Sequence, residues 1–428
     1  MIAQIHNTSR RASEDCLADL SALLSPSEAL ENILAGLRPI HGDEIVLTSQ
    51  ATGRIVAVDV VSDIALPRFD NSAVDGFGVH AADLDRDGGL SLRLDGAVHA
   101  GRTGPAVLVP GRTIRVLTGA EVPPGVAAIA MEEHTHHHGT AIAFDAAPEI
   151  GSNIRRAGED VAAGTIVLRR GSIVDSRHLA MLAACGVRQV RVLRRLRVGV
   201  MSTGNELVEP GPGIAPGLIT DSNRPMLLSL LSSPAMDVAD LGITADDPDR
   251  LSGELTRASA RFDLLISTGG VSGSEADYMH PALLSAGGRC RAMRLALRPG
   301  KPISAGSLGA MRVICLPGNP VAALVGYLLF VRPLVRRLIG APPGAPSPPA
   351  RTAETFFHKL GRTEFVPVSV VGYADDGMPL LRKLGRGGSA RLLPIVQSDG
   401  FAQIAADVGH VPEGGLVIYH RFDSILQL

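Results

Sequence analysis

The sequence predicts a multidomain α/β protein, on three grounds. The chain has 428 residues, which is more than one ordinary hydrophobic core accommodates, so two to four domains are expected. Residues 196–340 alternate strand, loop and helix, which predicts a mostly parallel sheet with helices on both faces. Residues 45–190 instead show short alternating runs broken by Gly, Pro and Asp, which are typical of a β-rich region.

The composition argues against several classes of function. A formal charge of −2 and an isoelectric point near 6.7 argue against bulk binding of nucleic acid or acidic membranes, so neither is expected as a partner. The four cysteines lie far apart with no C-x-x-C pair, as in reduced cytosolic proteins. The longest apolar run, 321–331, is too short to span a bilayer, and no apolar signal segment opens the chain. These features predict a cytoplasmic protein.

The N-terminal part combines one clear helix with short strands. Ser25 can cap a helix, Pro26 lies in its first turn and Glu28 completes a capping box. Strands are expected at "RIVAVDVVS", "LSLRLDGAV", "TIRVLTG" and "GTIVLRRGSIV". Because residues 175–187 are helical again, a simple arrangement is a small β domain inserted into a mixed α/β one.

The α/β part contains four strand-and-helix units. The expected strands are "LRVGVMSTGNEL", "MDVADLGIT", "FDLLISTGG" and "MRVICLPG". The expected helices are "TDSNRPMLLSLLSS", "DDPDRLSGELTRASA", the stretch through "DYMHPALLSAGG", and "NPVAALVGYLLFVRPLVRRLIG". The Pro/Gly-rich segment 340–349 predicts a stiff linker, and "EFVPVSVVGY" and "GLVIYHRF" after it predict a small C-terminal β domain.

Three of the strand ends carry loops of one character, namely 202–206, 267–277 and 316–320. Their glycines let backbone N–H groups approach an anion closely. Ligands of an open parallel sheet bind at the carboxyl ends of its strands, so these loops favour a binding pocket there. Glycine and serine also serve the geometry of βα turns, so one such loop alone would be weak support.

Acidic residues accompany these loops. Glu206, Asp246, Glu275 and Asp277 fall near the predicted strand ends, where carboxylates beside a phosphate site require a cation such as Mg²⁺ between them. Acids also favour the first turn of a helix. We assign that structural role to Asp247 and Glu275, prefer the cation role for Glu206 and Asp277, and leave both open for Asp246.

Three upstream segments have two interpretations each. In 66–79, Asp70 and Asp75 can serve hairpin turns without any ligand. The adjacent arginines of 153–160 suit an anion or salt bridges. The run "HTHHHG" suggests a metal, but its spacing matches no helical pair and no cysteine is near, so a solvated loop is expected.

Taken in order, nine segments resemble the family of molybdopterin molybdenumtransferases, which includes the MoeA proteins and the E domain of gephyrin. They span roughly residues 25–400 and read "PRFDNSAVDGF", "LTGAEVP", "NIRRAGED", "STGNEL", "DSN", "LGITADDP", "STGGVSGSEADY", "RPGKP" and "LPGNPVAAL".

The resemblance implies a four-domain subunit in an elongated homodimer. Residues 1–64 plus 150–192 would form a mixed α/β dimerisation domain, and 65–149 an inserted β-rich domain. Residues 193–340 would form a three-layer molybdopterin-binding α/β domain, and 341–428 the C-terminal β domain. The active site would lie between the α/β domain and the inserted domain of the partner subunit.

The implied reaction inserts molybdate into adenylated molybdopterin and releases AMP with Mg²⁺. The resemblance assigns catalytic roles to Asp75, Thr118, Glu206, Asp246 and Asp277, of which the last three would hold the metal. It assigns substrate binding to Ser267, Gly269, Gly270, Ser272, Arg294, Arg298, Lys301, Pro317, Gly318, Asn319, Pro320, Arg362 and Ser389. A molybdopterin adenylyltransferase and downstream molybdoenzymes are the further partners that it implies.

Two departures from the family pattern bear on activity. Arg294 and Arg298 stand where the family often has lysine, and arginine can bind an oxyanion bidentately but cannot give up its proton. Gly273 and Ser274 replace a bulkier residue followed by glycine. The alternatives to an insertase are a non-catalytic or diverged carrier or scaffold for the cofactor, and an adenylyltransferase, which the long flanking regions argue against. No G-x-G-x-x-G joins a strand to a helix, which disfavours a dinucleotide oxidoreductase.

Overall fold

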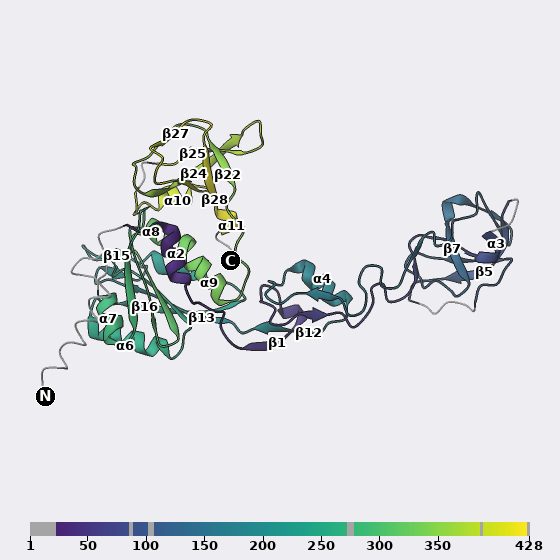
Figure 1. Cartoon of the computed structure of the whole chain (residues 1–428), viewed down its shortest axis with the longest axis horizontal. Coiled ribbons are helices and arrows are strands. Elements are labelled where there is room, and N and C mark those ends of the chain that lie inside the picture. The colour runs from purple at the N-terminus through teal and green to yellow at the C-terminus, as the bar shows by residue number, and fades with distance from the viewer. Residues whose placement is uncertain (1–22, 85–88, 102–106, 272–277, 386–387, 426–428) are drawn as a thin grey trace.

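The computed structural model describes residues 23–84, 89–101, 107–271, 278–385 and 388–425. The chain forms an elongated molecule with bodies in a row (Figure 1). A large α/β body carries the C-terminal domain beside it, and a small middle body contains β1 (Asp43–Leu47), β12 (Gln189–Leu193) and α4 (Ser176–Ala184). A β-rich body lies at the far end. The predicted multidomain α/β fold class is confirmed.

A six-stranded sheet organises the α/β body. Its order is β16 (Met236–Thr244), β13 (Leu196–Thr203), β17 (Leu264–Thr268), β21 (Met311–Leu316), β20 (Pro302–Leu308) and β18 (Arg289–Arg294). The first four strands are parallel, and β20 and β18 follow as antiparallel neighbours. The four predicted strands are therefore present, but the sequence reasoning missed β18 and β20.

Successive residues of the central strands point to opposite faces of this sheet. Ile266 packs in one core with helices α5 (Asn223–Leu230), α8 (Pro320–Gly326) and α9 (Arg332–Leu338). Leu265 packs in the other core with α6 (Pro248–Ser259) and α7 (Met279–Ser285). This alternation is what buries both sides of a parallel sheet. The three-layer arrangement that was predicted is confirmed.

The first described helix, α2 (Pro26–Leu34), begins as the sequence indicates. The Ser25 hydroxyl accepts from the Glu28 N–H at 3.2 Å, and the Glu28 carboxylate accepts from the Ser25 N–H at 2.8 Å. Its buried residue Ala29 lies in the same core as α9, although the helix stands near the start of the chain.

The long helix after β21 contains a π-helical turn. Residues Tyr327–Val331 form this turn between α8 and α9, and the Arg332 N–H donates five residues back to the Tyr327 carbonyl. Pro333 follows directly and lacks an N–H, while its ring would clash with a carbonyl four residues back, which favours the wider turn. The Tyr327 hydroxyl donates to the Leu230 carbonyl at 2.9 Å and fastens α5.

The β-rich body is built on a second six-stranded sheet. The strand order is β7 (Val126–Met131), β4 (Gly76–His80), β6 (Arg112–Val116), β5 (Ser91–Val98), β9 (Ala141–Phe144) and β8 (Thr135–His138), and α3 (Ala81–Leu84) follows β4. The strands β3 (Asn71–Ser72) and β10 (Ile154–Arg155) form a short antiparallel pair of their own, where the chain enters and leaves this body. Strands β2 (Val60–Val61) and β11 (Ile166–Leu168) pair nearer the middle body.

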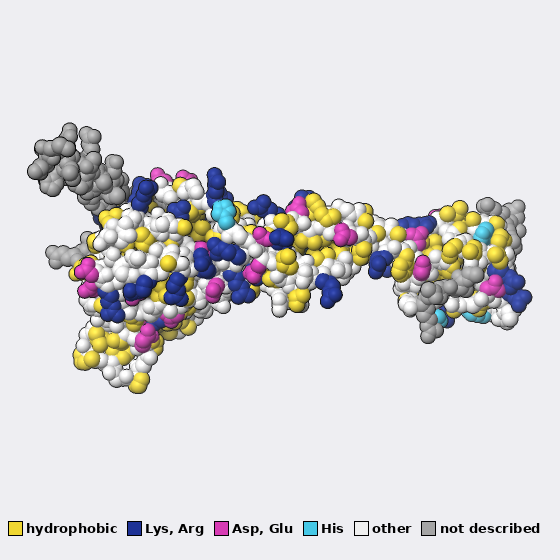
Figure 2. Space-filling model, turned by 90° about the horizontal axis from the view of Figure 1, so that it is seen from below, with side chains coloured by type: hydrophobic (Ala, Val, Ile, Leu, Met, Phe, Trp, Pro, Cys, Tyr) yellow, Lys and Arg dark blue, Asp and Glu magenta, His cyan; other side chains and the backbone are white. Residues whose placement is uncertain are grey.

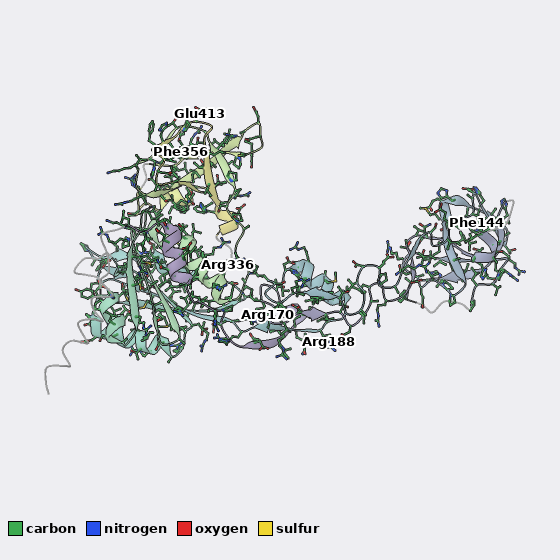
Figure 3. The ribbon with its side chains drawn as sticks, in the orientation of Figure 1. Phe144, Arg170, Arg188, Arg336, Phe356 and Glu413 are labelled. Carbon is green, nitrogen blue, oxygen red and sulfur yellow. The ribbon has the colours of Figure 1, made fainter. Side chains whose placement is uncertain are left out.

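The C-terminal domain closes into a barrel. Strand β24 (Thr363–Tyr373) pairs with both β25 (Pro379–Lys383) and β26 (Gly400–Ile404). The circle is completed by β22 (Pro349–Thr352) and β28 (Leu416–Arg421), with β23 (Phe356–Phe357) and β27 (His410–Val411) paired beside it and α10 (Leu393–Val396) and α11 (Phe422–Ile425) flanking. Each sheet has its own core, with Phe144 in the β-rich body and Phe356 in the barrel (Figure 3). The predicted C-terminal β domain is confirmed.

The surface carries both signs of charge. Basic and acidic side chains are interspersed over the face seen in Figure 2, in agreement with the formal charge of −2. Among the described residues, no helix is both long enough and apolar enough to cross a membrane.

Asp263 fixes the junction where the chain passes from β12 into β13. Its carboxylate has 13% of its surface exposed and accepts hydrogen bonds from the Arg194 guanidinium at 2.7 and 3.0 Å. It also accepts from the Arg197 backbone N–H at 2.9 Å and the Arg197 guanidinium at 3.0 Å. Burial alone raises the pKa of Asp263, but these hydrogen bonds outweigh burial and hold the pKa well below its usual range.

Replacing Asp263 by asparagine should lower the free energy of unfolding by about 2 kcal/mol at pH 7, because two arginines lose a shared anionic acceptor. The lowered pKa of Asp263 stabilises the fold above the unfolded value, about pH 4, and this contribution disappears as the pH falls further. Urea unfolding of wild type and Asp263→Asn at pH 7 and pH 3 measures both effects. Asp375→Asn, at an exposed position of the barrel, is the control, and equal losses in the two variants would contradict the assignment.

Candidate functional site

A pocket of about 660 Å³ lies where the carboxyl ends of the parallel strands meet the C-terminal domain. The α/β body contributes the strand-end loops and the segment between β18 and β20, and the barrel contributes β24 and the loop at Gly388. Its lining residues are Thr203, Gly204, Glu206, Asp246, Gly269, Gly270, Val271, Leu297, Arg298, Pro299, Gly300, Lys301, Pro302, Pro317, Gly318, Asn319, Val321, Ala322, Arg362, Glu364, Phe365, Val366, Pro367, Gly388 and Ser389.

The floor of the pocket depends on a close approach of two backbones. Gly269 has a φ of +94°, and a Cβ at this position would lie 2.2 Å from the Thr203 carbonyl oxygen. Gly270 has a φ of +65°, and a Cβ there would lie 3.0 Å from the Thr203 hydroxyl. Only glycine combines these conformations with such a contact. The glycines after β17 therefore serve packing against β13 as well as any ligand.

Asn223 connects two of the strand-end loops and was not predicted as a site residue. Its amide donates to the Thr268 hydroxyl at 2.7 Å and to the Gly318 carbonyl at 2.7 Å. The Thr268 hydroxyl in turn donates to the Pro317 carbonyl at 3.2 Å. The segment "DSN" was counted among the segments that resemble the family and among the helix-cap candidates, but no role was assigned to Asn223, and nothing local to the segment predicts these long-range bonds.

Arg224 holds the helix that carries Asn223. Its guanidinium is 5% exposed and pairs with Asp221 at 3.0 Å, and also with Glu209 and Asp240. A buried arginine satisfied by three carboxylates gives α5 a fixed position under the pocket.

One end of the pocket is acidic. Glu206 is exposed and Asp246 is half-buried, and one oxygen of the Asp246 carboxylate is buried with no hydrogen-bond partner among the described residues. Burial raises the pKa of Asp246, and the nearby charge of Glu206 raises it further, against a hydrogen bond from the Asn205 backbone. By contrast, Asp247 accepts from the Arg250 N–H at 2.8 Å as the cap of α6, so the structural role predicted for it is confirmed.

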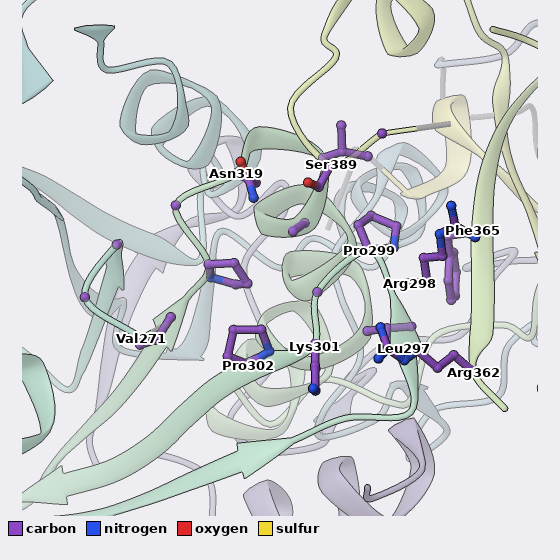
Figure 4. A pocket seen from close by; sticks show the side chains of 18 of the residues that line it. Val271, Leu297, Arg298, Pro299, Lys301, Pro302, Asn319, Arg362, Phe365 and Ser389 are labelled. Carbon is purple, nitrogen blue, oxygen red and sulfur yellow. The ribbon is translucent and has the colours of Figure 1, made fainter. Parts of the chain in front are cut away.

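Another wall of the pocket is basic. Arg298, Lys301 and Arg362 line it, and Arg294 lies close enough to act on Lys301. The charge of Arg294, then burial, then the charge of Arg362 lower the pKa of Lys301. Cations held this close together favour a multiply charged anion between them. Figure 4 shows Arg298, Arg362 and Phe365 together on one side, with Val271 on the opposite side.

An apolar surface adjoins the basic wall. Leu297, Pro299 and Val321 from the α/β body and Phe365 from the barrel line it, and Leu297, Val321 and Phe365 belong to one buried core. Pockets of this kind, apolar with a few placed charges, are typical of small-molecule sites. Leu297 and Phe365 were not predicted, because their contact joins two domains far apart in the sequence.

The predicted substrate-binding residues are distributed as follows. Gly269, Gly270, Arg298, Lys301, Pro317, Gly318, Asn319, Arg362 and Ser389 line the pocket. Ser267 is fully buried inside β17, Pro320 lies in the first turn of α8, and Arg294 stands next to Lys301. Ser272 and Asp277, and Glu275 with them, lie outside the described residues.

Asp75 and Thr118 form a pair of their own in the β-rich body. The Asp75 carboxylate accepts from the Thr118 hydroxyl at 2.6 Å and from the Thr118 N–H at 2.7 Å. These bonds, with a smaller contribution from Arg115, lower the pKa of Asp75. Both residues are exposed, and within one chain their body lies far from the pocket (Figure 1).

The other upstream segments have structural partners. Asp70 accepts from Arg156 at 2.6 Å and from the Ala157 N–H at 2.8 Å, which supports the salt-bridge interpretation of 153–160. The prediction of a loop at "HTHHHG" was wrong, because Thr135–His138 form β8, an edge strand that pairs with β9. His136 to His138 are exposed, as expected, and His136 contacts Asp145 at 2.8 Å. The described residues contain no group of three or more His, Cys, Asp or Glu arranged to hold a metal ion.

Comparison with known families matches nearly the whole chain. Residues 24–186 match the model for the MoeA N-terminal region, domains I and II. Residues 199–337 match the probable molybdopterin binding domain, and 349–422 the MoeA C-terminal region, domain IV. A molybdopterin molybdenumtransferase of Haemophilus influenzae is 34% identical over 94% of this chain and 100% of its own length.

The chain belongs to the MoeA family. A second relative, molybdopterin molybdenumtransferase 2 of Mycobacterium tuberculosis, is 34% identical over 89% of this chain and 95% of its own. The solved structure of a molybdopterin biosynthesis MoeA protein from Pyrococcus horikoshii superposes with a TM-score of 0.79 at 28% identity, over 94% of this chain and 99% of that one. The family suggested by the sequence motifs is thereby confirmed, while the exact domain boundaries stay predictions.

Proposed function

We propose that the protein is a molybdopterin molybdenumtransferase, which inserts molybdate into adenylated molybdopterin and releases AMP. The observation that carries the proposal is one pocket with an acidic end, a basic wall and an apolar surface. Two relatives that are 34% identical bear the name of this transferase, which supports the same assignment here.

The basic wall suits both anions of this reaction. Molybdate is a dianion, and adenylated molybdopterin carries a diphosphate. Arg298 and Arg362 can each hold oxyanion oxygens through paired N–H groups, whereas Lys301 acts as a point charge. The pKa of Lys301 is lowered, first by the charge of Arg294, so its Nζ gives up a proton more readily than that of an isolated lysine. The apolar surface would orient the pterin ring and exclude water from it.

The acidic end fits a divalent cation. A buried Asp246 oxygen lacks a partner among the described residues, and burial together with the charge of Glu206 makes ionisation of Asp246 unfavourable without a counter-ion. Glu206 and Asp246 would therefore hold Mg²⁺, with Asp277 as the third predicted acid. When bound, Mg²⁺ would neutralise diphosphate oxygens and polarise the bond to the leaving AMP.

A second subunit would complete the site in this proposal. Asp75 and Thr118 are held as an exposed pair far from the pocket of their own chain, so a homodimer is needed to bring them to it. The lowered pKa of Asp75 keeps its carboxylate charged and able to meet a cation or a hydroxyl donor. We also propose a cytoplasmic location, a molybdopterin adenylyltransferase as supplier of the substrate, and molybdoenzymes as acceptors of the product.

Purified protein supplied with adenylated molybdopterin, Mg²⁺ and molybdate should release AMP in amounts equal to the molybdenum inserted. The reason is that breaking the phosphate anhydride bond accompanies loading of the dithiolene. Chromatography of the nucleotides over time measures AMP, and a reaction without molybdate is the control. Tight binding of the adenylate with no molybdate-stimulated release would favour a carrier or scaffold instead.

Asp246→Asn should reduce Mg²⁺-dependent AMP release at least about tenfold, because one carboxylate ligand of the cation is lost. The neighbouring Asp247→Asn should leave the rate unchanged, since asparagine caps a helix as well as aspartate does. Because the pKa of Asp246 is raised, protons should compete with Mg²⁺ at a higher pH than for an ordinary aspartate, and the apparent Mg²⁺ affinity should fall as the pH falls. An unchanged Mg²⁺ titration in Asp246→Asn would reject the metal role.

Mixed dimers test the contribution of the second subunit. Asp75→Asn and Glu206→Gln homodimers should both be inactive, whereas a heterodimer of the two contains one site with both acids intact. Differently tagged subunits, co-expressed and purified through both tags, should therefore regain about half of the wild-type AMP release, one site of two. A heterodimer as inactive as its parents would show that Asp75 and Glu206 act within one chain or in separate steps.

A further inference from the structure

The barrel is joined to the α/β body along one edge of the pocket. Strand β19 (Leu297–Arg298) pairs in parallel with the start of β24, so that Arg298 lies opposite Glu364. The Glu364 carboxylate, 6% exposed, is 3.4 Å from the Arg298 Nε. Both residues line the pocket. A buried carboxylate of one domain thus orients a pocket cation of the other.

A buried histidine stands on the other side of Glu364. The His358 side chain is 0% exposed, and its Nε2 is 3.8 Å from the second Glu364 oxygen. The same Nε2 lies 2.8 Å from the Arg362 carbonyl oxygen, and Nδ1 lies 2.6 Å from the Val408 carbonyl oxygen. His358 therefore contacts the backbone of one pocket residue and the side chain of another.

Both ring nitrogens of His358 face carbonyl oxygens, which is unusual for a buried histidine. Carbonyl oxygens only accept, whereas a neutral imidazole has one donor and one acceptor. If the ring donated once, a nitrogen lone pair would face a carbonyl oxygen in a site without solvent. Both contacts are satisfied together only when both ring nitrogens donate, and the positive charge then faces Glu364.

A second buried histidine in the same barrel has a different environment. His420 Nδ1 lies 2.9 Å from the Ser347 hydroxyl, which can donate, and Nε2 lies 2.8 Å from the Gln403 side-chain oxygen. A neutral ring satisfies both partners, and burial lowers the pKa of His420 to about 4. His420 is not among the residues that line the pocket, so it is a matched control for His358.

We propose that His358, donating from both ring nitrogens, and Glu364 are positioning residues that hold Arg362 and Arg298 in the basic wall. His358 anchors the backbone at Arg362, and Glu364 keeps the Arg298 guanidinium against the wall. The three charges form a chain, His358, Glu364 and Arg298, in which the central anion offsets both cations. The arrangement of charges rests on geometry alone, whereas its effect on anion binding rests on the proposed function.

Selective ¹⁵N labelling of histidine tests the charge chain in the full-length protein. The protein has 13 histidines, and the signals that are missing from the His358→Phe spectrum identify His358. At neutral pH, wild type should show both His358 ring nitrogens carrying hydrogen. In Glu364→Gln, one of the two His358 ring nitrogens should lose its hydrogen, because the carboxylate that faces the ring is gone. A bare ring nitrogen in the wild-type spectrum, or the same doubly protonated signature in Glu364→Gln, would overturn the proposal.

Molybdate binding, measured by calorimetry with sodium molybdate, tests the positioning role. Glu364→Gln and His358→Phe should each weaken molybdate binding about tenfold, which corresponds to one charge-assisted hydrogen bond. His420→Phe should bind molybdate like wild type, even if it unfolds more easily. If His358→Phe does not fold, Glu364→Gln alone decides, and unchanged affinity in Glu364→Gln rejects the positioning role. Failure of wild type to bind molybdate would count against the proposed function, and the ¹⁵N spectrum would still decide the charge chain.

Discussion

The candidate site depends on one constraint, the close contact between the ends of β13 and β17. The Thr203 carbonyl fills the space that a side chain at Gly269 would need, so the chain leaves the sheet with positive φ angles at Gly269 and Gly270. This departure opens the carboxyl edge of the sheet instead of covering it with side chains. The loops after β21 are held to the same edge by Asn223, and α5 beneath them is fixed by Arg224. A pocket floor of backbone and small residues follows from this packing.

The charges around that floor are separated by sign, with Glu206 and Asp246 at one end and a basic wall in which Glu364 pairs with Arg298. Burial and the charge of Glu206 raise the pKa of Asp246, and the charge of Arg294, burial and the charge of Arg362 lower the pKa of Lys301. In a cavity partly shielded from water, such groups are costly unless a ligand of opposite charge is bound. A cation at one end and a multiply charged anion at the other would relieve both. This arrangement supports the metal-assisted reaction of a phosphate-bearing substrate that we propose.

The sequence predicted what is local and missed what is paired at a distance. Ser25 and Asp247 cap their helices as their positions indicate, because a cap depends on residues within one turn. The strands β18 and β20 were missed, since the glycine- and arginine-rich segment around them shows no clear alternation. The glycine loops and acids marked the correct edge of the sheet. That Phe365 and Glu364 from the barrel would complete the wall could not be predicted, because β19 and β24 pair across more than 60 residues of sequence.

The position of Asp75 is the strongest physical argument for assembly. The Thr118 hydroxyl and N–H hold the Asp75 carboxylate at an exposed surface. The carboxylate therefore lies outside the core of the β-rich body. The body that carries it is joined to the rest of the chain through the short pairs β3–β10 and β2–β11, and it lies at the far end of the molecule from the pocket of its own chain (Figure 1). A second copy can meet the pocket without such a cost, since the elongated shape leaves both the pocket and the Asp75 surface accessible. In the proposed homodimer, the extended form of the chain would let each subunit supply Asp75 and Thr118 to the pocket of the other.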